Sequence, residues 1–426
     1  MIDLKLLRQD PRTVRAALAR RGDPSVLEAL DQIVALDERR RGIIARVEAL
    51  KAERNAASEE VARRKKERQP AEDLLATLKV SGEQVKGLDA ELRGVEESLD
   101  SVAMRVPNLP HADAPEGDAT ANRVVRTWGE IREFPFAARP HWEIGEALRI
   151  LDLPRGAKVA GSGFPVLRGD GARLVRALAG FMLDLHTREH GYVEIASPYL
   201  VNRASLTGTG QLPKFEDDLY GLPDDLFLIP TAEVPVTNLH RDEILEPGAL
   251  PVAYCAWTPC FRREAGAAGK DTRGLIRLHQ FDKVELVRLC RPSESDVEHQ
   301  RITAHAEAVL QRLELPYRVL ELATGDTGFA SARTFDLEVW APGVGAWLEV
   351  SSASTFTDFQ ARRAGLRFRP ETGARPEFVH TLNASGLAFP RTIIALLEQG
   401  QQADGSVRIP AALAPYLGTD RLAVRG

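Results

Sequence analysis

Charged and apolar side chains alternate along residues 274–287, GLIRLHQFDKVELV, which predicts a strand with one polar face. The side chains that would share that face are Arg277, His279, Phe281, Lys283 and Glu285. A strand-like run ending in Arg262 and Glu264 precedes it, so the two runs would form a hairpin. Because arginine donates well to phosphate and carboxylate groups, the hairpin is predicted to bind an anion. The alternative is a hairpin whose polar face is simply solvated, although Phe281 would be unusual among the charges of such a face.

The tip of this hairpin, residues 265–273, contains three alanines, two glycines, Lys270 and Arg273. That composition is typical of a mobile basic loop. The sequence therefore predicts a hairpin with a long flexible tip and one strongly polar face.

Composition places the chain among soluble globular proteins. Its 426 residues suggest two or three domains, with 44% hydrophobic and 27% charged residues. The net charge of −5 gives no overall attraction to nucleic acid, so any RNA contact needs a local basic patch and DNA is not expected as a partner.

Targeting and cysteine usage favour a reduced, cytoplasmic setting. The three cysteines form no Cys-x-x-Cys pair and are too few for a disulfide framework or a structural zinc site, so we expect them in the core. The N-terminus, MIDLKLLRQDPRTV, lacks the apolar segment of a signal peptide. No run of 18 apolar residues is present, so no membrane span is predicted.

Residues 1–106 have the pattern of a helical arm. Two series with a period of seven residues run through 74–106, at positions 78, 85, 92, 99, 106 and at 74, 81, 88, 95, 102. A weaker version in residues 26–62 uses Leu30, Ile33, Ile44, Val47 and Val61, with Asp37 and Arg40 among the interruptions. Pro70 separates the two segments, so we predict an antiparallel coiled-coil hairpin.

The far end of that arm is strongly basic. It reads ARRKKERQP, and its basic residues are Arg63, Arg64, Lys65, Lys66 and Arg68. A charge run is usually a solvated helix face, and that interpretation stays open. A basic tip on a long arm would also suit contact with a remote phosphate backbone.

The rest of the chain predicts an α+β domain. Residues 107–125, rich in Pro, Ala, Asp and Gly, are typical of a linker, which leaves 126–426 as the second domain. Strand-like runs recur without regularly alternating helices, so an antiparallel sheet flanked by helices is predicted. A final helix would begin near Pro390 and end at Gly400, with Arg391 in its first turn. A positive charge there opposes the helix dipole, which favours an anion as its partner.

Several motifs in order resemble those of a bacterial seryl-tRNA synthetase of class II, along essentially the whole chain. Motif 1 would be residues 171–198, ending at Pro198. Motif 2 would be Phe261-Arg262-Arg263-Glu264 followed by RLHQFDKVE, and motif 3 would be NASGLAFPRTIIALLEQ. The serine branch adds Thr231-Ala232-Glu233, GTGQLPKFEDDLY and DFQARR. Each motif alone is weak, since Thr-x-Glu occurs by chance and Glu349 would suit any exposed strand, but their number and order are specific.

The resemblance implies that ATP and serine form seryl-adenylate and that the seryl group then passes to tRNA(Ser). Arg262 would bridge the serine carboxylate and the α-phosphate, and Arg391 would hold the distal phosphates. Phe281 would stack on adenine, with Glu264 and Leu278 at its polar edge. The remaining ATP contacts would be Arg263, Val350 and Ser351, and the Mg²⁺ ligands would be Glu349 and Ser352. The serine pocket would comprise Thr231, Ala232, Glu233, Arg262, Glu285, Asn383 and Ser385.

The resemblance further implies a homodimer, through motif 1, and tRNA binding by the arm, through residues 63–68. The chain departs from the family pattern at Ala353, Phe356, Ala384, Phe389 and Pro390. None of these changes removes a charge or a hydroxyl from the expected site.

Two other functions remain to be distinguished. A paralogue could activate serine for a biosynthetic, carrier-loading or resistance role, although carrier-loading relatives resemble this family without the long arm. A non-catalytic RNA-binding or scaffold protein would be expected to lose Arg262, Glu285, Glu349 or Arg391, and all four are present.

Overall fold

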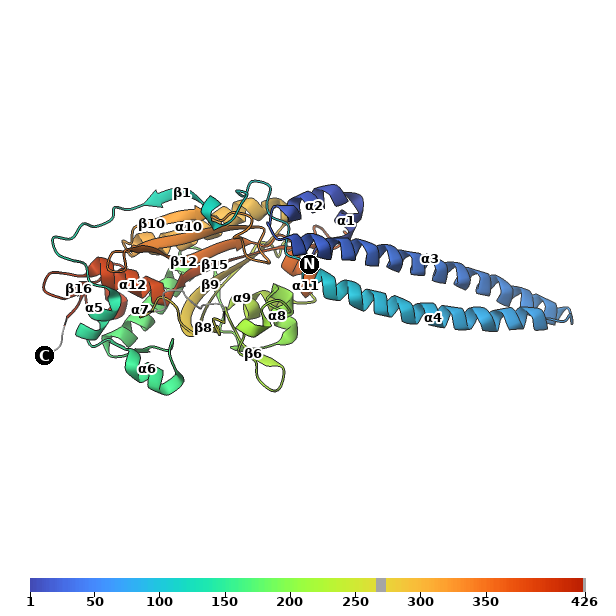
Figure 1. Ribbon diagram of the computed structural model, residues 1–426, viewed down its shortest axis with the longest axis horizontal. Coiled ribbons are helices and arrows are strands. Elements are labelled where there is room, and N and C mark those ends of the chain that lie inside the picture. The colour runs from blue at the N-terminus through green and yellow to red at the C-terminus, as the bar shows by residue number, and fades with distance from the viewer. Residues whose placement is uncertain (266–272, 424–426) are drawn as a thin grey trace. The chain divides into compact units, whose positions relative to one another are not determined.

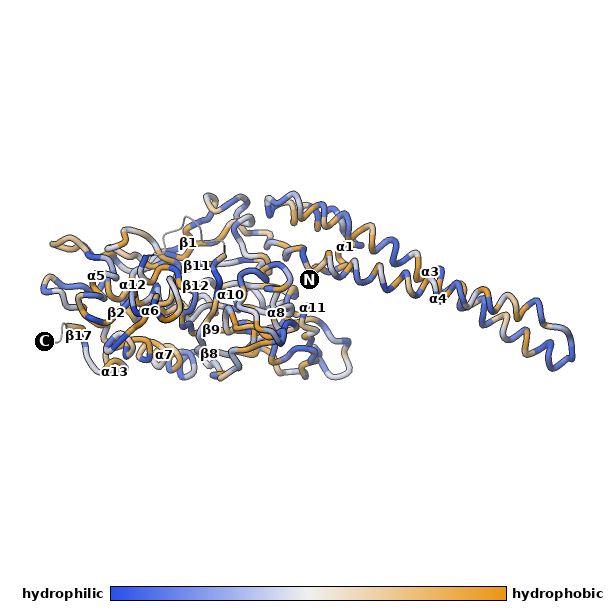
Figure 2. Tube along the Cα trace, turned by 60° about the horizontal axis from the view of Figure 1, so that its bottom comes forward, coloured by the Kyte–Doolittle hydropathy of each residue, from blue (hydrophilic) through white to orange (hydrophobic). Residues whose placement is uncertain are grey.

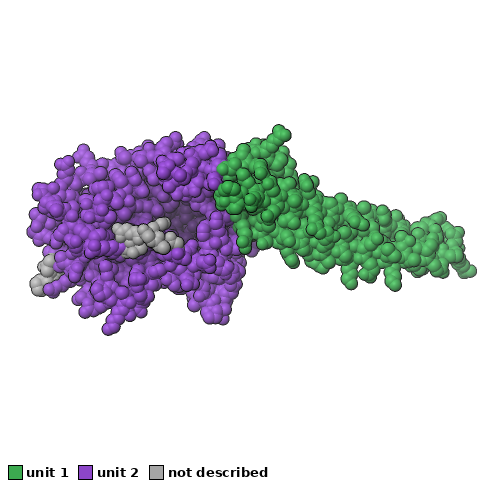
Figure 3. Space-filling model, in the orientation of Figure 1, with its two compact units in different colours: residues 1–19, 23–107 green, residues 20–22, 108–426 purple. Residues whose placement is uncertain are grey.

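The computed structural model describes residues 1–265 and 273–423, and the chain forms two compact units (Figure 3). The first comprises residues 1–19 and 23–107, and the second comprises residues 20–22 and 108–426. The predicted mobile tip of the hairpin falls mostly on residues 266–272, which lie outside the described part of the chain.

The first unit is helical (Figure 1). Its helices are α1 (Leu4–Gln9), α2 (Pro11–Ala19), α3 (Pro24–Lys66) and α4 (Glu72–Ala103). The Asp23 side chain caps α3 by accepting a 3.0 Å hydrogen bond from the Ser25 backbone, and Pro24 occupies the first turn, where its missing N–H costs nothing. The helices α3 and α4 run antiparallel over a short connection that contains Pro70, as predicted.

A seam of apolar residues joins α3 to α4, and Figure 2 shows hydrophobic and hydrophilic residues alternating along both helices. Its buried centre consists of Ile43, Val47, Val85 and Val95. The sequence pattern selected Ile44, which is wrong for this seam. Steps of alternately three and four residues from Ile33 lead to position 43.

One interruption of the seam, Asp37, is buried with its charge compensated. Its carboxylate accepts hydrogen bonds from Arg8 Nε at 2.7 Å and from Arg41 Nε at 3.1 Å, and these arginines hold the pKa of Asp37 below its ordinary value. The short helix α1 therefore supplies a partner to α3, which the sequence pattern did not anticipate.

The second unit is built on an eight-stranded sheet, with neighbouring strands in the order β1-β10-β11-β12-β15-β9-β8-β4 (Figure 1). Neighbours are antiparallel except β4 and β8, which are parallel. These strands are β1 (Arg123–Trp128), β4 (Val193–Glu194), β8 (Val252–Phe261), β9 (Gln280–Cys290), β10 (Tyr317–Glu321), β11 (Arg333–Ala341), β12 (Ala346–Thr355) and β15 (His380–Ala388). The predicted α+β class, a helical arm plus an antiparallel sheet flanked by helices, is confirmed.

Smaller ladders and helices complete this unit. The ladders are β2 (Leu151–Asp152) with β3 (Val166–Leu167), β5 (Leu200–Asn202) with β6 (Leu226–Leu228), β7 (Ile244–Leu245) and β14 (Glu377–Phe378) on either side of β13 (Arg367–Phe368), and β16 (Val407–Arg408) with β17 (Arg421–Leu422). The helices are α5 (His141–Ala147), α6 (Leu153–Ala160), α7 (Asp170–Arg188), α8 (Arg203–Thr209), α9 (Glu233–Thr237), α10 (Ser295–Arg312), α11 (Phe359–Ala364), α12 (Phe389–Gly400) and α13 (Ala414–Leu417). None of the helices in residues 1–265 and 273–423 is long and apolar enough to cross a bilayer.

The two faces of β9 serve different purposes. Val284 and Leu286 join the large core that contains residues of α7, α10 and α12. Val287 and Leu289 face the opposite way, into a smaller core with residues of α9 and α11. Glu285 lies on that second face, so the strand alternation places its carboxylate away from the main core.

The strand predicted within residues 274–287 begins later than expected, at Gln280. The β8–β9 ladder ends at the pair Phe261–Gln280, and Gly274 has a left-handed φ of 70°. Residues 275–279 are held instead by other segments: the Leu275 N–H donates to His141 Nε2 and the His279 N–H to the Gly163 carbonyl, both at 3.0 Å. The hairpin still reaches His279, whose carbonyl accepts from the Arg262 N–H at 2.9 Å. The alternation argument is therefore correct for Phe281, Lys283 and Glu285, whereas residues 275–278 lie outside the β8–β9 ladder.

The segment predicted as a linker is tied to the second unit. Asn108 is buried, and its N–H donates to the Phe329 carbonyl at 2.9 Å. Further along, the Pro115 carbonyl accepts from the Thr324 N–H at 2.8 Å, and β1 begins at Arg123. Its proline- and aspartate-rich composition therefore accompanies an ordered path over the domain surface.

Candidate active site

Two neighbouring cavities open on the face of the sheet that carries Glu285. The smaller, of about 170 Å³, contains Phe281, Glu349 and Arg391 in its lining. The larger, of about 570 Å³, contains Thr231 and Glu233. Three charged residues, Arg262, Glu264 and Arg277, line both cavities, so the two adjoin along these side chains.

Arg262 stands at this junction, just after β8 ends. Its guanidinium lies 5.2 Å from the ring centroid of Phe281, and its Nε donates to the Pro230 carbonyl at 3.4 Å. The neighbouring Glu264 forms an ion pair with Arg277 and has a left-handed φ of 53°. Departure from the strand conformation thus turns Glu264 toward the arginine that precedes β9.

Arg391 occupies the first turn of α12, as predicted, and connects two other segments. Its Nε donates to the Ile276 carbonyl at 3.2 Å, and its Nη1 donates to the Glu349 carbonyl at 2.7 Å. The Glu349 carboxylate lies 3.6 Å from the same Nη1. The smaller cavity is therefore lined by two arginines, Arg262 and Arg391, and by the ring of Phe281.

Buried polar groups converge between the two cavities. Thr231 Oγ1 donates to Glu285 Oε2 at 2.7 Å and accepts from Lys283 Nζ at 2.9 Å. Lys283 and Glu285 form an ion pair in which both side chains are almost fully buried. Asn383 Nδ2 on β15 donates to Glu285 Oε1 at 3.2 Å. This network fixes a threonine hydroxyl, a carboxylate and an ammonium group, which are groups that recognise a small polar ligand.

Glu233, at the start of α9, is buried and lines the larger cavity. Its Oε1 accepts a 2.6 Å hydrogen bond from Gln360 Nε2, and Gln360 in turn accepts from Thr381 Oγ1 at 2.6 Å. Burial, together with the charge of Glu285, raises the pKa of Glu233 from 4.5 to about 7. Near neutral pH this carboxyl is therefore poised between its charged and uncharged forms.

That shift makes stability depend on pH in a direction that Glu233→Gln should reveal. Between pH 4.5 and about 7 the unfolded chain releases the Glu233 proton while the folded chain retains it. The contribution of Glu233 to the free energy of unfolding of the unsubstituted chain therefore falls as the pH rises through this range. The free energy of unfolding of Glu233→Gln, relative to that of the unsubstituted chain, should therefore increase from pH 5 to pH 8, by up to about 3 kcal/mol. Urea unfolding of both proteins at the two pH values measures this, and parallel pH profiles would contradict it.

Three oxygen donors lie on β12 and β11, and one of them, Glu349, lines the smaller cavity. Glu349 is exposed, and Ser352, on the same strand, lies opposite Asp336 of β11 in the ladder. Asp336 Oδ1 is buried with no hydrogen-bond partner among the residues described. Burial and the nearby charge of Glu349 raise the pKa of Asp336 well above its ordinary value, against a hydrogen bond from Ser352. Hard cations favour oxygen donors of this kind.

Most of the residues predicted for the site lie at the two cavities or in the network between them. Those that line a cavity are Thr231, Glu233, Arg262, Glu264, Leu278, Phe281, Glu349, Val350, Ser385 and Arg391. Ser352 lines neither cavity and lies opposite Asp336 in the ladder. Three others point elsewhere. Ala232 packs in the core beside Val236, the Arg263 guanidinium lies 6.0 Å from the Tyr220 ring centroid, and Ser351 Oγ donates to the Ser385 carbonyl at 2.6 Å.

Sequence reasoning assigned no role in the site to Lys283, Gln360 or Asp336. Lys283 was visible, because strand alternation places it between Phe281 and Glu285 on the polar face. Gln360 lies in the DFQARR run, whose pattern suggested a family feature and no particular contact. Asp336 gave no signal, because its relation to Ser352 depends on the pairing of two strands.

Departures from the family pattern have unequal consequences. Pro390 lines the smaller cavity and Phe356 the larger, so these two shape the walls directly. Ala353 and Ala384 face each other across the β12–β15 ladder, fully buried, and Phe389 also lies in the core. Of the five changes, Pro390 and Phe356 line the two cavities described above, and Phe389 lines a neighbouring cavity of about 370 Å³ together with Phe281.

At the far end of α3, the basic residues differ in how their charge is compensated. Arg63 and Arg64 donate to Glu60 at 2.8 and 3.0 Å, and Arg64 also contacts Asp73 at 3.1 Å. No ion pair of Lys65, Lys66 or Arg68 is found within residues 1–265 and 273–423. Because acidic residues of the same unit already compensate Arg63 and Arg64, a solvated helix face accounts best for these two arginines.

Comparison with known proteins covers the chain from end to end. The family described as "Seryl-tRNA synthetase N-terminal domain" matches residues 1–110, and the "tRNA synthetase class II core domain (G, H, P, S and T)" matches residues 214–400. A Serine--tRNA ligase of Gemmatimonas aurantiaca is 57% identical over 99% of this chain and 100% of its own length. One from Thermomicrobium roseum is 55% identical over 98% of this chain and 94% of its own length.

Solved structures agree with these relatives. The seryl-tRNA synthetase of Pyrococcus horikoshii, complexed with ATP, superposes with a TM-score of 0.96 at 38% identity and covers 100% of both chains. The cytoplasmic serine-tRNA ligase of Naegleria fowleri, in complex with AMP, gives a TM-score of 0.89 at 30% identity over 100% of this chain and 99% of its own. Full-length identity, the helical unit and the antiparallel sheet together show that this chain belongs to the class II seryl-tRNA synthetase family.

Proposed function

We propose that this chain attaches serine to tRNA(Ser) in two steps. A carboxylate oxygen of serine attacks the α-phosphorus of ATP, the bond to the bridging oxygen of the β-phosphate breaks, and pyrophosphate leaves. The resulting seryl-adenylate then gives its seryl group to the terminal ribose of the tRNA, and AMP leaves. Relatives named Serine--tRNA ligase, at 57% and 55% identity over nearly the whole chain, support this activity over that of a serine-activating paralogue.

The single observation that carries the proposal is the meeting of the two cavities at Arg262. A reaction between a carboxylate and a phosphate brings two anions together, so it needs a fixed cation between them. Arg262 lines both cavities and presents a planar guanidinium that can bond to two oxygens at once. We assign it to bridging the serine carboxylate and the α-phosphate.

ATP would occupy the smaller cavity. Phe281 provides a ring for stacking on adenine, and Glu264 and the backbone near Leu278 lie within reach of its polar edge. Arg391 would hold the distal phosphates, and its present bonds to two backbone carbonyls keep its side chain in place before ATP arrives. In such a site positioning supplies most of the acceleration, because no protein nucleophile is required.

Serine would occupy the side of the larger cavity nearest Thr231. Glu233 and Glu285 can accept hydrogen bonds from its ammonium and hydroxyl groups, with Asn383 and Ser385 nearby. A hydroxyl is selected by hydrogen bonds, because an alanine in its place would leave these buried groups unpaired. The network from Lys283 through Thr231 to Glu285 would hold these acceptors in position.

The residues beside the smaller cavity fit Mg²⁺ as well as ATP. Glu349 and Ser352 are oxygen donors, and Mg²⁺ typically takes one or two carboxylates and completes its shell with phosphate and water. No cluster of three or more His, Cys, Asp or Glu able to hold a metal occurs in residues 1–265 and 273–423, which agrees with an ion brought in with the nucleotide. When bound, Mg²⁺ would neutralise charge on the phosphates; Glu349 and Ser352 would hold it.

Glu349→Ala should raise the Mg²⁺ concentration required for half-maximal pyrophosphate exchange by about tenfold or more. Removing the carboxylate takes away the only charged ligand assigned to the ion. A matched control is Glu338→Ala, because Glu338 stands opposite Glu349 in the ladder but is paired with Arg318. A Mg²⁺ titration of exchange activity compares the three proteins, and an unchanged requirement in Glu349→Ala would contradict the assignment.

We assign residues 1–106 to a tRNA-binding arm, apart from residues 20–22, which belong to the second unit, and residues 126–426 to the catalytic domain; residues 107–125 connect the two and bond to the second unit. The tRNA would be contacted through its phosphate backbone and shape by Lys65, Lys66 and Arg68, together with Arg63 and Arg64.

Dimerisation through α7 and β4 would give a homodimer; β4 is an edge strand whose Val193 is 58% exposed. We expect light scattering to show a dimer, and a fully active monomer would contradict this. A cytoplasmic location follows from this function.

The deciding experiment measures ATP–pyrophosphate exchange with serine, threonine, alanine and glycine, followed by charging of total tRNA. We expect exchange with serine far above that with the other three amino acids, and stable seryl-tRNA as the product. Exchange without charging would favour a serine-activating paralogue. No exchange with any of the four would refute the proposed enzyme.

A further inference from the structure

The loop between β10 and β11 forms one wall of the larger cavity. Residues Gly328, Phe329, Ala330 and Ser331 line it, opposite the segment that contains Thr209 and Gly210. The loop has no regular secondary structure and is largely buried, so its backbone carbonyls cannot bond within a helix or a sheet. Buried carbonyls need partners, and the identity of those partners decides what fixes the wall.

Six successive carbonyls, from residue 327 to residue 332, all accept hydrogen bonds from residues 21, 108 and 111. The donors, in order along the loop, are Arg21 Nη1 to Thr327 at 2.8 Å and to Gly328 at 3.2 Å, the Asn108 N–H to Phe329 at 2.9 Å, Asn108 Nδ2 to Ala330 at 3.0 Å, Arg21 Nη2 to Ser331 at 2.5 Å and the His111 N–H to Ala332 at 2.8 Å. One side of the loop backbone is therefore held by two short segments that are remote in sequence.

Arg21 is the central donor of this set. Its side chain makes five hydrogen bonds, and every one of them ends on a backbone carbonyl, two of these on Asn108. The residue is only 8% exposed, and burial lowers its pKa to about 10. A guanidinium presents five donors in a rigid plane, so it can hold several carbonyls in one arrangement where an ammonium group cannot.

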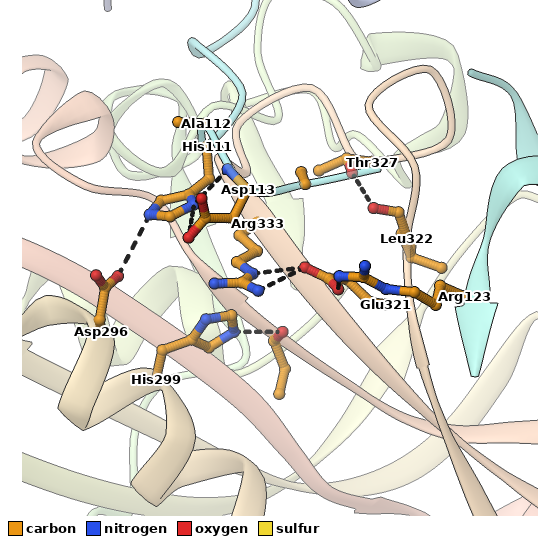
Figure 4. A network of polar contacts seen from close by, with 12 residues as sticks. His111, Ala112, Asp113, Arg123, Asp296, His299, Glu321, Leu322, Thr327 and Arg333 are labelled. Atoms are coloured by element: carbon orange, nitrogen blue, oxygen red, sulfur yellow. Dashed lines mark hydrogen bonds and ion pairs between the residues drawn. The ribbon is translucent and has the colours of Figure 1, made fainter. Parts of the chain in front are cut away.

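The two ends of the loop are fixed separately (Figure 4). Glu321, fully buried at the end of β10, accepts from Arg333 Nε at 2.7 Å and from Arg123 Nη2 at 2.5 Å. Thr327 Oγ1 points back to the Leu322 carbonyl at 3.5 Å. Ion pairs thus anchor the flanking strands, and the cavity-lining middle depends on Arg21 and Asn108.

The position of the loop affects the width of the cavity. Gly210, on the opposite wall, has a left-handed φ of +91°, and a Cβ there would come within 3.3 Å of the Ala330 Cβ. The two walls therefore lie so close here that a Cβ on residue 210 would crowd the side chain of Ala330. The Gly210 wall is itself linked to Glu233 through Gln360, which donates to the Thr209 carbonyl at 3.1 Å. A shift of the loop would open the cavity beside the carboxyl assigned to serine.

We propose that Arg21, together with Asn108, is a positioning residue that sets the width of the serine cavity by holding the carbonyls of residues 327–332. This inference rests on the proposed function, because it assigns the cavity to serine. Arg21 itself touches no substrate. It acts through the loop, so it influences serine binding and the exclusion of larger amino acids, and it leaves the ATP cavity unchanged.

The test compares Arg21→Met, Arg21→Lys and the matched control Arg20→Met in the full chain. Arg20 also donates to three backbone carbonyls, those of His111, Ala112 and Ala114, but none of these lines the cavity. Pyrophosphate exchange gives KM for serine, KM for ATP, kcat, and the ratio of kcat/KM for serine over threonine. Thermal unfolding of each variant is measured alongside.

We expect Arg21→Met to raise KM for serine about tenfold or more and to lower the serine-over-threonine ratio by a similar factor. KM for ATP should stay within about twofold, because the loop does not line the smaller cavity. Arg21→Lys should give an intermediate result, and Arg20→Met should resemble the unsubstituted chain. A purely structural role would reduce the active fraction, lowering kcat while both KM values and the ratio stay unchanged, and that result would overturn the inference.

If Arg21→Met fails to fold, Arg21→Lys and the isosteric Asn108→Asp decide. The aspartate turns an acceptor toward the carbonyls of Ala330 and Phe356, which Asn108 Nδ2 now bonds at 3.0 and 2.7 Å, so the same rise in KM for serine is expected. Unchanged serine parameters in both variants would overturn the inference and leave the proposed function standing. An unsubstituted chain without serine-dependent exchange would overturn both.

Discussion

Arg262→Ala should lower serine-dependent exchange of pyrophosphate into ATP by at least about 10³-fold, because the two other cations near both substrate positions, Arg277 and Lys283, are already ion-paired with Glu264 and Glu285. The side chain lines both cavities and is already held beside Phe281 and the Pro230 carbonyl. Its loss leaves two anions facing each other in a partly desolvated site. Exchange measured at saturating serine and ATP tests this expectation.

Two further variants show whether the effect belongs to the guanidinium. Arg262→Lys keeps the charge and loses the two-pronged donor, so we expect it to recover only part of the activity. Arg203→Ala removes an arginine that is paired with Glu216 and Asp225 and lines neither cavity, so its exchange rate should match that of the unsubstituted chain. Exchange of ordinary rate in Arg262→Ala would refute the bridging role.

Deletion of residues 27–104 should spare seryl-adenylate formation and reduce tRNA charging by about 100-fold or more. The deletion removes most of α3 and α4 with the basic residues 63–68, and it retains Arg21, Asn108 and every residue that lines the two cavities. Exchange activity and charging are measured on the same preparation. Charging that survives the deletion would give these helices another purpose.

A milder variant separates charge from the helices themselves. Replacing Lys65, Lys66 and Arg68 by alanine in the full chain should raise KM for tRNA and make KM less dependent on salt. Each phosphate contact that is lost reduces the number of counterions released when tRNA binds. Exchange should be unaffected. Equal salt dependence before and after the replacement would favour a solvated basic face without a role in binding.

Periodic patterns predicted the elements of the fold well, and their details less well. The seven-residue series through Val85 and Val95 identified α4, and the position of Arg391 after Pro390 located α12. The same pattern selected Ile44 over Ile43, because on α3 charged residues interrupt the seam and leave its phase ambiguous. Strand alternation could not show that β9 starts at Gln280, since that depends on partners such as His141 and Gly163 far away in sequence.

For the candidate site, sequence reveals the residues whose own side chains act and conceals those that act through others. Arg262, Phe281 and Glu285 are visible because their types suit a ligand and their spacing suits a strand. Asp336 depends on its place opposite Ser352, which only the ladder determines. The loop of residues 327–332 is further hidden, because carbonyl groups are common to all residues and carry no signal in the sequence.

Because residues 20–22 belong to the second unit, they limit how the chain can be shortened without loss of contacts in that unit. In chain order the long helices are an interior insert, flanked by Gly22 and Asn108, and not a prefix that can be trimmed away. A fragment beginning at residue 108 would retain both cavities and lack Arg21. Excision of residues 23–107 from within the chain is therefore the shortening that keeps residues 20–22 joined to the unit to which they belong.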